Sequence, residues 1–287
     1  MIVEPAVWVN GERLSTTGVH ISVYDRGFTL ADGLFETMRA HGGTIFRLDN
    51  HLARLEHGLA TLDIPRPPQL HEWVLASGRA IDRGDARIRV TVTRGIGVAG
   101  VAPPADPSPT VVVAVGPLPI FPSNIYKVGL TAHVASGRRS ERSMTAGLKT
   151  LAYTEAVAAL IEARRAGADD ALFLDTGDHC SEATSSNLFV WSGTSLATPP
   201  VTCGALPGIT RAVVLELAHS LGLPASERVV ELRELMSAEE AFLTSSLRGI
   251  APLTKVDDHA IGSGVPGALT GQLTAAYTAL VTEECGL

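Results

Sequence analysis

The stretch Thr145-Ala-Gly-Leu-Lys149-Thr-Leu-Ala-Tyr153 contains one of only three lysines in a chain of 287 residues, the others being Lys127 and Lys255. Lysine and arginine together number 23, so arginine supplies nearly all the positive charge. Arginine cannot act as an amine nucleophile, because its guanidinium keeps its proton in proteins. Small and apolar neighbours ahead of an expected helix disfavour the ammonium form of Lys149 and favour Schiff-base chemistry. On position alone, a surface lysine with a packed stem is the better-supported alternative.

The composition is that of an ordinary globular protein, with 45% hydrophobic and 18% charged residues and a net charge of -7. The length suits two modest domains or one large one. The negative charge and the lack of a dense basic run argue against nucleic-acid binding. We find no apolar stretch of membrane-spanning length, no signal peptide and no phosphate-binding glycine motif. Three widely spaced cysteines fit a reducing cytoplasm better than a disulfide framework or a metal site.

The first part of the chain reads as strands with two helices. Residues 6–14 predict a hairpin with Asn10-Gly11 at its turn. Residues 86–94 alternate between an apolar face and a polar face that carries Arg87 and Arg89. A strand face with two arginines is either exposed to solvent or lines a pocket that binds an anion.

Two helices are expected between these strands. Asp49 or Asn50 is expected to cap the first helix, whose leucines recur at core spacing. His51 and Arg54 share a neighbouring face of it and are a candidate anion site, although such a pair is usually solvated. The second helix is expected from about Leu70 to Asp82.

A glycine-punctuated segment, residues 23–39, has more charged residues than a simple connector needs, which indicates a site or an interface. The alternative is a polar loop with an internal Asp25–Arg26 pair. The clearest domain boundary is Gly116-Pro-Leu-Pro-Ile-Phe-Pro122, because closely spaced prolines make a stiff linker. We therefore expect a small domain over 1–116, a linker over 117–122 and a large domain over 123–287.

In the second part, strands and helices interleave, beginning with a strand near residues 128–135. The helix after Lys149 is expected to bury one stripe of Tyr153, Val157, Leu160 and Ile161 and to stop at Gly167. Glu182 lies in a hydroxyl-rich bend between two apolar strands. A carboxylate buried there needs a cationic or protonated partner. Taken without the rest of the chain, Glu182 is better explained as an exposed acid in a turn.

Two further segments offer groups for an anion. Leu206-Pro-Gly-Ile209-Thr210-Arg211 precedes a helix expected over 212–222, where the first backbone N–H groups and a hydroxyl are available. Thr244-Ser-Ser246 ends an apolar strand in hydroxyls. An amine nucleophile, an acid and two segments that can bind an anion suit pyridoxal 5′-phosphate, which has an aldehyde, a ring nitrogen and a phosphate.

At this point the chain resembles the class IV, fold type IV pyridoxal-phosphate enzymes over essentially its whole length. The segments that carry the resemblance are Asp25-Arg-Gly, Asp32-Gly-Leu-Phe-Glu-Thr37, His51-Leu-Ala-Arg54-Leu, Lys149-Thr-Leu-Ala-Tyr153, Ser181-Glu182, Asn187-Leu-Phe, Leu206-Pro-Gly-Ile-Thr-Arg211 and Thr244-Ser-Ser246. The resemblance implies a mixed α/β fold, with a small N-terminal α/β domain and a larger C-terminal domain built on a mixed, barrel-like sheet. It also implies a homodimer with a shared active site, in which the loop around Arg26 reaches the partner.

The resemblance assigns roles residue by residue. Lys149 is implied to form the Schiff base and to move the proton, Glu182 to pair with the ring nitrogen, and Tyr153 to hydrogen-bond the ring oxygen. The phosphate is implied to be held by Arg54, the Ile209 and Thr210 amides, the Thr210 hydroxyl and Ser246. No metal is implied.

The reaction is less fully specified, because transamination and the lyase reaction share all the cofactor residues. The Arg-x-His pair of well-known D-amino acid aminotransferases is absent after Arg94. Candidates for the substrate carboxylate are Arg26, Arg87, Arg89 and the Leu247-Arg248 turn, with Phe35 as a pocket wall.

The first hypothesis is a transaminase acting on a D-amino acid or a branched-chain L-amino acid with a 2-oxo acid acceptor. The second is a 4-amino-4-deoxychorismate lyase that releases pyruvate and 4-aminobenzoate, in which Thr37 is the implied proton donor. The third is an (R)-selective amine transaminase. A non-catalytic cofactor-binding homologue is disfavoured because Lys149 and Glu182 are both present.

Overall fold

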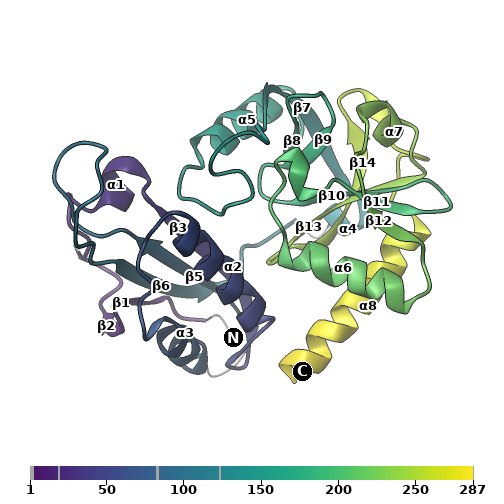
Figure 1. Cartoon of the computed structure of the whole chain (residues 1–287). Coiled ribbons are helices and arrows are strands. Elements are labelled where there is room, and N and C mark those ends of the chain that lie inside the picture. The colour runs from purple at the N-terminus through teal and green to yellow at the C-terminus, as the bar shows by residue number, and fades with distance from the viewer. Residues whose placement is uncertain (1–2, 19, 82–83, 123, 287) are drawn as a thin grey trace. The chain divides into compact units, whose positions relative to one another are not determined.

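The computed structural model describes residues 3–18, 20–81, 84–122 and 124–286. The chain forms two compact units, which are described separately (Figure 1). The first comprises Met1–Pro119, Leu148–Ala152 and Val281–Leu287, and the second comprises Ile120–Gly147 and Tyr153–Leu280. The first change of unit falls inside the expected linker, 117–122, and residue 123 lies outside the described residues. The sequence led us to expect each domain to be one continuous stretch of chain. The segment Leu148–Ala152, which contains Lys149, belongs to the first unit although it lies within the range expected for the large domain.

The first unit is built on a six-stranded antiparallel sheet with the order β2-β1-β6-β5-β3-β4. Its strands are β1 (Ala6–Val9), β2 (Glu12–Leu14), β3 (Gly33–His41), β4 (Thr44–Ile45), β5 (Asp85–Thr93) and β6 (Thr110–Pro117). The hairpin between β1 and β2 confirms the expected turn. Asn10 and Gly11 there have φ of 49° and 85°, the left-handed region that a tight two-residue hairpin requires.

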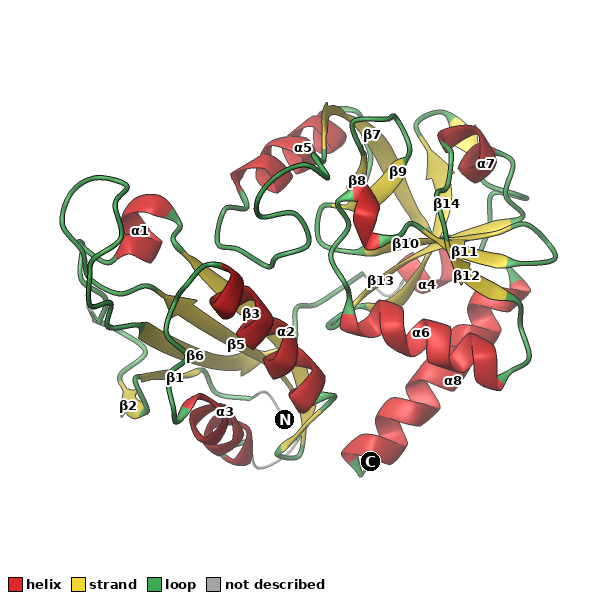
Figure 2. Ribbon diagram, in the orientation of Figure 1, coloured by secondary structure: helices red, strands yellow, loops and turns green. Residues whose placement is uncertain are grey.

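Two helices, α2 (Leu48–Thr61) and α3 (Leu70–Arg79), cover one face of this sheet (Figure 2). The apolar face of β5 is buried beneath them, as its alternation predicts. The core shared by sheet and helices is formed by Trp8, Leu34, Met38, Leu52, Leu55, Leu59, Leu70, Val74, Ile88, Val90, Val92, Val111, Val113 and Val115. The opposite face of β5 carries Arg87 and Arg89, which are half-buried.

The start of α2 differs from the expectation. The helix begins at Leu48, and Arg47 occupies the cap position with φ of 53° and no side-chain cap hydrogen bond. Asp49 and Asn50 therefore lie inside the first turn rather than capping it. Packing of the leucine stripe fixes the helix start in place of a cap. The helix expected from Leu70 ends at Arg79, and Asp82 lies outside the described residues.

The second unit contains a closed barrel, because β9 pairs with both β8 and β10. The circuit runs β10-β13-β14-β7-β8-β9 and back to β10. β7 is parallel to β8 and to β14, and the remaining pairs of the circuit are antiparallel. These strands are β7 (Leu130–Arg138), β8 (Asp170–Leu174), β9 (Cys180–Ala183), β10 (Asn187–Trp191), β13 (Glu240–Ser245) and β14 (Gly249–Val256). The mixed, barrel-like sheet is thus confirmed.

Short strands and helices complete this unit. β11 (Leu196–Thr198) and β12 (Ala225–Glu227) extend the sheet from β10, and β15 (His259–Ala260) pairs with β14. The helices are α4 (Ile125–Val128), α5 (Thr154–Arg165), α6 (Ile209–Ser220), α7 (Leu232–Met236) and the part of α8 (Ala268–Cys285) up to Leu280, with a 3-10 turn at Val201–Cys203. In the core, Phe189 and Phe242 stack across β10 and β13 with ring centroids 5.0 Å apart. The expected strand near 128–135 begins only at Leu130, because α4 precedes it.

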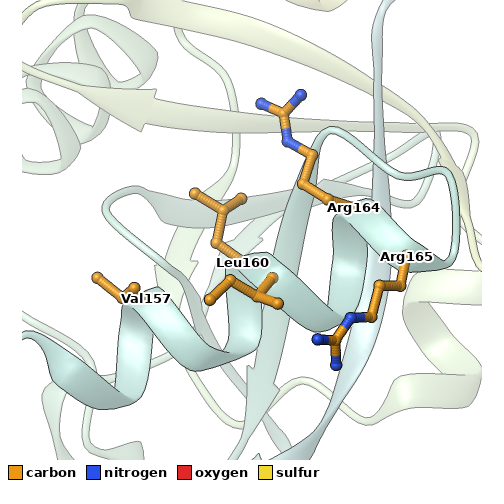
Figure 3. Close-up of a pocket in the computed structure, with 5 residues that line it drawn as sticks. Val157, Leu160, Arg164 and Arg165 are labelled. Atoms are coloured by element: carbon orange, nitrogen blue, oxygen red, sulfur yellow. The ribbon is translucent and has the colours of Figure 1, made fainter.

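Helix α5 packs with a different face from the expected one. It buries Ala156, Ala159 and Ala163 against β7 and β8, whereas Val157 is 55% and Ile161 47% exposed. Alanine lets the helix approach the barrel closely, so the larger apolar side chains stay outside. Figure 3 shows Val157 and Leu160 projecting from this helix near Arg164 and Arg165, where they line a shallow surface pocket.

No helix in the described part of the chain is both long and apolar enough to cross a bilayer.

Candidate functional site

The segment that carries Lys149 runs beside the start of β3 in the first unit. The Phe35 amide donates to the Lys149 carbonyl at 3.0 Å, and the Leu151 amide donates to the Gly33 carbonyl at 3.0 Å. Gly33 is needed there, because a Cβ would lie 2.5 Å from the carbonyl oxygen of Val92. These contacts fix the backbone of Lys149 against the sheet.

Two cationic groups lie over the ring of Phe35. The Nζ of Lys149 is 4.5 Å and the Cζ of Arg89 is 3.7 Å from its centroid. Thr37 is the cross-strand partner of Arg89 on the same face. Arg87 is the next arginine on this face, and its Nε is buried without a hydrogen-bond partner in the described structure. The polar face of β5 predicted from the sequence therefore forms one cationic surface with Lys149.

Behind this surface, Glu36 projects to the opposite, core side of β3 and is fully buried. Its carboxylate accepts from His51 Nδ1 at 2.7 Å, and from Arg54 Nε at 2.7 Å and Nη2 at 2.8 Å. Burial alone would raise the pKa of Glu36, but the hydrogen bonds and charges of His51 and Arg54 outweigh it and lower the pKa to about 2.

His51 is buried too, and burial lowers its pKa, while its Nδ1 lies within hydrogen-bond distance of the Glu36 carboxylate. The pair of basic residues is not solvated, as such pairs usually are, because it neutralises a carboxylate in the core. The bidentate contact with Glu36 also fixes the plane of the Arg54 guanidinium.

Arg26 makes its contacts with a loop of the first unit. It is buried; its Nε binds Asp32 at 2.7 Å, and its Nη1 and Nη2 donate to the carbonyls of residues 100–102 at 3.0–3.2 Å. Asp25 does not pair with it, but caps α1 (Arg26–Leu30) and accepts from Thr93. Four hydrogen bonds thus hold its guanidinium against the loop, and a contact between Arg26 and a substrate stays a prediction.

In the second unit, the barrel register brings three polar residues side by side. Asn187 on β10 pairs with Glu182 on β9 and with Thr244 on β13. Glu182 Oε2 accepts from the Leu206 amide at 2.8 Å and from Asn187 Nδ2 at 3.4 Å, and Nδ2 also donates to the Leu206 carbonyl at 2.8 Å. The Glu182 side chain is only 12% exposed. It is therefore a largely buried acid supplied with donors, and the simple exposed turn acid is excluded.

The same strands hold the start of α6 in place. A Cβ on Gly208 would come within 1.9 Å of Asn187 Oδ1, so the chain approaches this closely only with glycine. The helix begins at Ile209, three residues before the expected start. The amides of Ile209 and Thr210 therefore lie in the first turn, where helices leave backbone donors without internal partners. Thr210 itself is buried.

The remaining predicted residues lie at element ends of this unit. Tyr153 occupies the cap position of α5, and Ser246, Leu247 and Arg248 form the turn between β13 and β14. The Arg248 side chain points to Asp170 at 3.6 Å and to the Phe121 ring at 5.3 Å, while its carbonyl accepts from Tyr126. Only the backbone of this turn is thus suited to a carboxylate.

Sequence reasoning missed two groups. Glu36 carried a usable signal: it occupies a core position between Leu34 and Met38 in an alternating strand. Arg139, whose Nη2 lies 3.5 Å from Glu182, is marked in the sequence only by its neighbours Arg138 and Arg142, which do not distinguish it. No group of three or more His, Cys, Asp or Glu residues in the described part of the chain could hold a metal ion.

Comparison with known proteins gives a consistent result. A family described as "Amino-transferase class IV" matches residues 33–256. A putative branched-chain-amino-acid aminotransferase of Methanocaldococcus jannaschii is 32% identical, with 96% of each chain covered. A D-alanine aminotransferase of Bacillus licheniformis is also 32% identical, over 97% of this chain and 98% of its own.

Two solved structures resemble this one closely. The branched-chain aminotransferase of Escherichia coli superimposes with a TM-score of 0.91 at 28% identity, covering 97% of this chain and 95% of its own. The 4-amino-4-deoxychorismate lyase of Pseudomonas aeruginosa superimposes with a TM-score of 0.84 at 34% identity, covering 96% of this chain and 98% of its own.

The buried Glu36 cluster makes a prediction for stability. The carboxyl titrates near 4.5 when unfolded and at about 2 when folded, so its stabilisation is complete above pH 4.5 and is lost as pH falls toward 2. We expect Glu36→Gln to lower the free energy of unfolding by roughly 3 kcal/mol at pH 7 and by only about 1 kcal/mol at pH 3. Urea unfolding followed by tryptophan fluorescence measures both values.

The matched control is Glu56→Gln, which removes a half-exposed carboxylate paired with Arg66 in the same unit. We expect this control to change the free energy by less than about 0.5 kcal/mol. An equal loss at both pH values for Glu36→Gln would show that its charge does not stabilise the unit.

Proposed function

The chain belongs to the class IV aminotransferases, which depend on pyridoxal 5′-phosphate, and from that premise we propose that it is a transaminase moving an amino group between an amino acid and a 2-oxo acid. The observation that carries the proposal is Glu182, a largely buried acid that is held by backbone and amide donors, in a chain that also has the candidate amine nucleophile Lys149.

The residues present fit the cofactor. The hydroxyls of Ser181, Ser186 and Thr244 are buried without hydrogen-bond partners in the described structure. Such groups cost about 1–3 kcal/mol each when unpaired, which a polar ligand can offset. The first turn of α6, opened by Gly208, offers backbone donors of the kind that bind phosphate.

When bound, pyridoxal 5′-phosphate supplies an aldehyde carbon for an amine and a ring that withdraws electrons from the substrate's α-carbon. In the proposal Lys149 holds the aldehyde carbon and then moves the proton at the α-carbon. The Glu182 carboxylate holds the proton on the ring nitrogen. The Tyr153 hydroxyl donates to the ring oxygen.

The phosphate is proposed to bind Arg54, the amides of Ile209 and Thr210, the Thr210 hydroxyl and Ser246. Support comes from the first turn of α6 and from Glu36, which fixes the Arg54 guanidinium through two hydrogen bonds. Thr210 is buried in the first turn of the same helix.

For the substrate carboxylate we propose Arg89, with Arg87, Thr37 and the Leu247-Arg248 backbone as further contacts and Phe35 as the pocket wall. Arg89 is held flat on the Phe35 ring, on the same cationic face as Lys149. A guanidinium held in this way binds a carboxylate with little loss of side-chain freedom.

The second candidate is a 4-amino-4-deoxychorismate lyase. Thr37 lies beside Arg89 on the face that carries Phe35, where a hydroxyl could give a proton to a leaving fragment. The relatives divide between these activities at similar identity, so substrate tests must decide the reaction.

The test of function is a half-reaction. The holoenzyme is mixed separately with D-alanine, L-leucine, D-glutamate and (R)-1-phenylethylamine, and its absorption spectrum is followed. We expect one of the amino acids to convert the cofactor to pyridoxamine 5′-phosphate, and borohydride to fix the untreated cofactor on Lys149. Lys149→Ala should do neither; a borohydride adduct in that variant would refute the assignment.

The lyase is recognised in the same experiment. If no amino donor converts the cofactor, yet aminodeoxychorismate yields pyruvate and 4-aminobenzoate, the transaminase proposal is wrong and the second candidate is correct.

The carboxylate assignment makes a separate prediction. We expect Arg89→Met to raise KM for the amino acid donor about 10- to 100-fold, the value of one hydrogen bond to a charged group. The same variant should leave (R)-1-phenylethylamine, which has no carboxylate, within about threefold of the parent. Arg87→Met is the comparison variant on the same strand face. A larger rise in KM for Arg87→Met than for Arg89→Met would make Arg87 the main carboxylate contact.

We further propose a homodimer in the cytoplasm. Large apolar side chains are exposed on α1 and on two adjoining loops of the first unit, at Val23, Tyr24, Phe28, Ile96, Val98 and Val101. A patch of this kind usually marks an interface. The buried, unpaired cysteines support a reducing compartment.

The dimer is tested by sedimentation velocity of the holoenzyme. We expect a dimer that Val98→Lys weakens at least about tenfold, because the substitution places a charge in an apolar contact. Val265→Lys, on an exposed valine of the second unit, is the control and should leave the dimer intact. A monomeric parent protein would exclude the proposal.

A further inference from the structure

Arg139 follows directly after β7 in the second unit and belongs to none of the roles assigned above. Its amide donates to the Leu174 carbonyl at 2.8 Å, which ties the end of β7 to β8. Its neighbour Arg138 projects to the surface and binds Asp178 at 2.8 Å. The two adjacent arginines therefore have separate surroundings, and only Arg139 is directed toward the barrel residues of the proposed site.

Packing, more than charge, fixes the Arg139 side chain. Its Cζ lies 4.4 Å from the centroid of the buried Phe173 ring. Gly204, with φ of 78°, lies against the stem, where a Cβ would come within 2.9 Å of Arg139 Cγ. The Nε is buried without a hydrogen-bond partner in the described structure. The guanidinium is thus held in one orientation at a cost in unsatisfied hydrogen bonding.

That orientation directs its terminal nitrogens at two carboxylates. Nη1 lies 3.4 Å from Glu155 Oε2, and Nη2 lies 3.5 Å from Glu182 Oε1. Both distances exceed the 2.7–2.9 Å of a strong charge-assisted hydrogen bond. The other oxygen of Glu182 accepts from the Leu206 amide and from Asn187. A cation at 3.5 Å still favours the ionised carboxylate without competing for its position.

We propose that Arg139 is a positioning residue that keeps Glu182 ionised and turned so that Oε1 can pair with a protonated ring nitrogen. This inference rests on the proposed function, because it needs the cofactor ring beside Glu182. Arg139 itself transfers no proton, since its guanidinium keeps its charge at all working pH values.

The alternative is a purely structural role, in which Arg139 bridges Glu155 and Phe173 whatever Glu182 does. A double-mutant cycle separates the two, since coupling appears only where one residue acts through the other. The variants are Arg139→Met, which keeps the stem and the ring contact, Glu182→Gln, and the pair. Arg138→Met is the matched control on the adjacent arginine.

The readouts are the dissociation constant of pyridoxal 5′-phosphate for the apoprotein, from quenching of tryptophan fluorescence, and the thermal midpoint of the apoprotein. We expect Arg139→Met to weaken the cofactor about tenfold in the parent and less than about twofold in the Glu182→Gln background. Arg138→Met should change neither readout. The thermal midpoint should fall equally when Arg139→Met is made in either background.

An equal loss of affinity in both backgrounds would overturn the proposal, and so would no loss in the parent. If Arg139→Met does not fold, Arg139→Lys replaces it: the retained cation should keep affinity within about threefold, and a tenfold loss would contradict a role through charge. A parent protein that binds no cofactor refutes the proposed function and this inference together. A parent that binds it on Lys149 while the cycle shows no coupling refutes this inference alone.

Discussion

A carboxylate taken out of water must be met by hydrogen-bond donors or by cations, and this constraint shapes both units of the protein. In the first unit it applies to Glu36, which lies in the apolar core on β3 and is neutralised by two basic residues of α2. In the second it applies to Glu182, which receives an amide from the loop before α6 and the side chain of Asn187. Neither acid would be stable at its position if those donors were absent.

Each acid therefore locates the elements around it. Glu36 joins α2 to β3 and sets the direction of Arg54, so one cluster serves the stability of the unit and the orientation of a proposed ligand. Glu182 binds the Leu206 amide while Asn187 binds the Leu206 carbonyl, and these contacts place the first turn of α6. The acid proposed to face the cofactor ring thus also fixes the donors proposed to hold its phosphate.

The family to which the chain belongs explains why these features are easier to assign than the substrate. Relatives named for different activities share about a third of their residues with this chain over nearly its whole length. The cofactor chemistry needs the lysine, the acid and the hydrogen-bond donors that bind the phosphate, whether the reaction is transamination or the lyase reaction. In the proposal, substrate choice depends instead on a few side chains of the β3 and β5 face, where Arg89 lies on Phe35 beside Thr37.

The alternation of apolar and polar residues was enough to predict which face of a strand is buried. The alternation of β5 and the Asn10-Gly11 turn were predicted correctly, because side-chain direction along a strand and the φ of a tight turn are properties of neighbouring residues. The motifs that carry the resemblance likewise indicated the family, since their order and spacing are carried by the sequence itself.

Tertiary packing decided what periodicity cannot. Periodicity groups the residues of α5 into faces, but the close approach of β7 and β8 selected the alanine face over the larger apolar one. Arg26 is enclosed by the carbonyls of a loop about 75 residues farther along the chain, a contact that its neighbours in sequence do not indicate. The Glu36 cluster and the contact between Arg139 and Glu182 likewise join residues distant in sequence. Such contacts depend on which surfaces meet when the chain folds. The residues on either side of each partner in the sequence do not specify them.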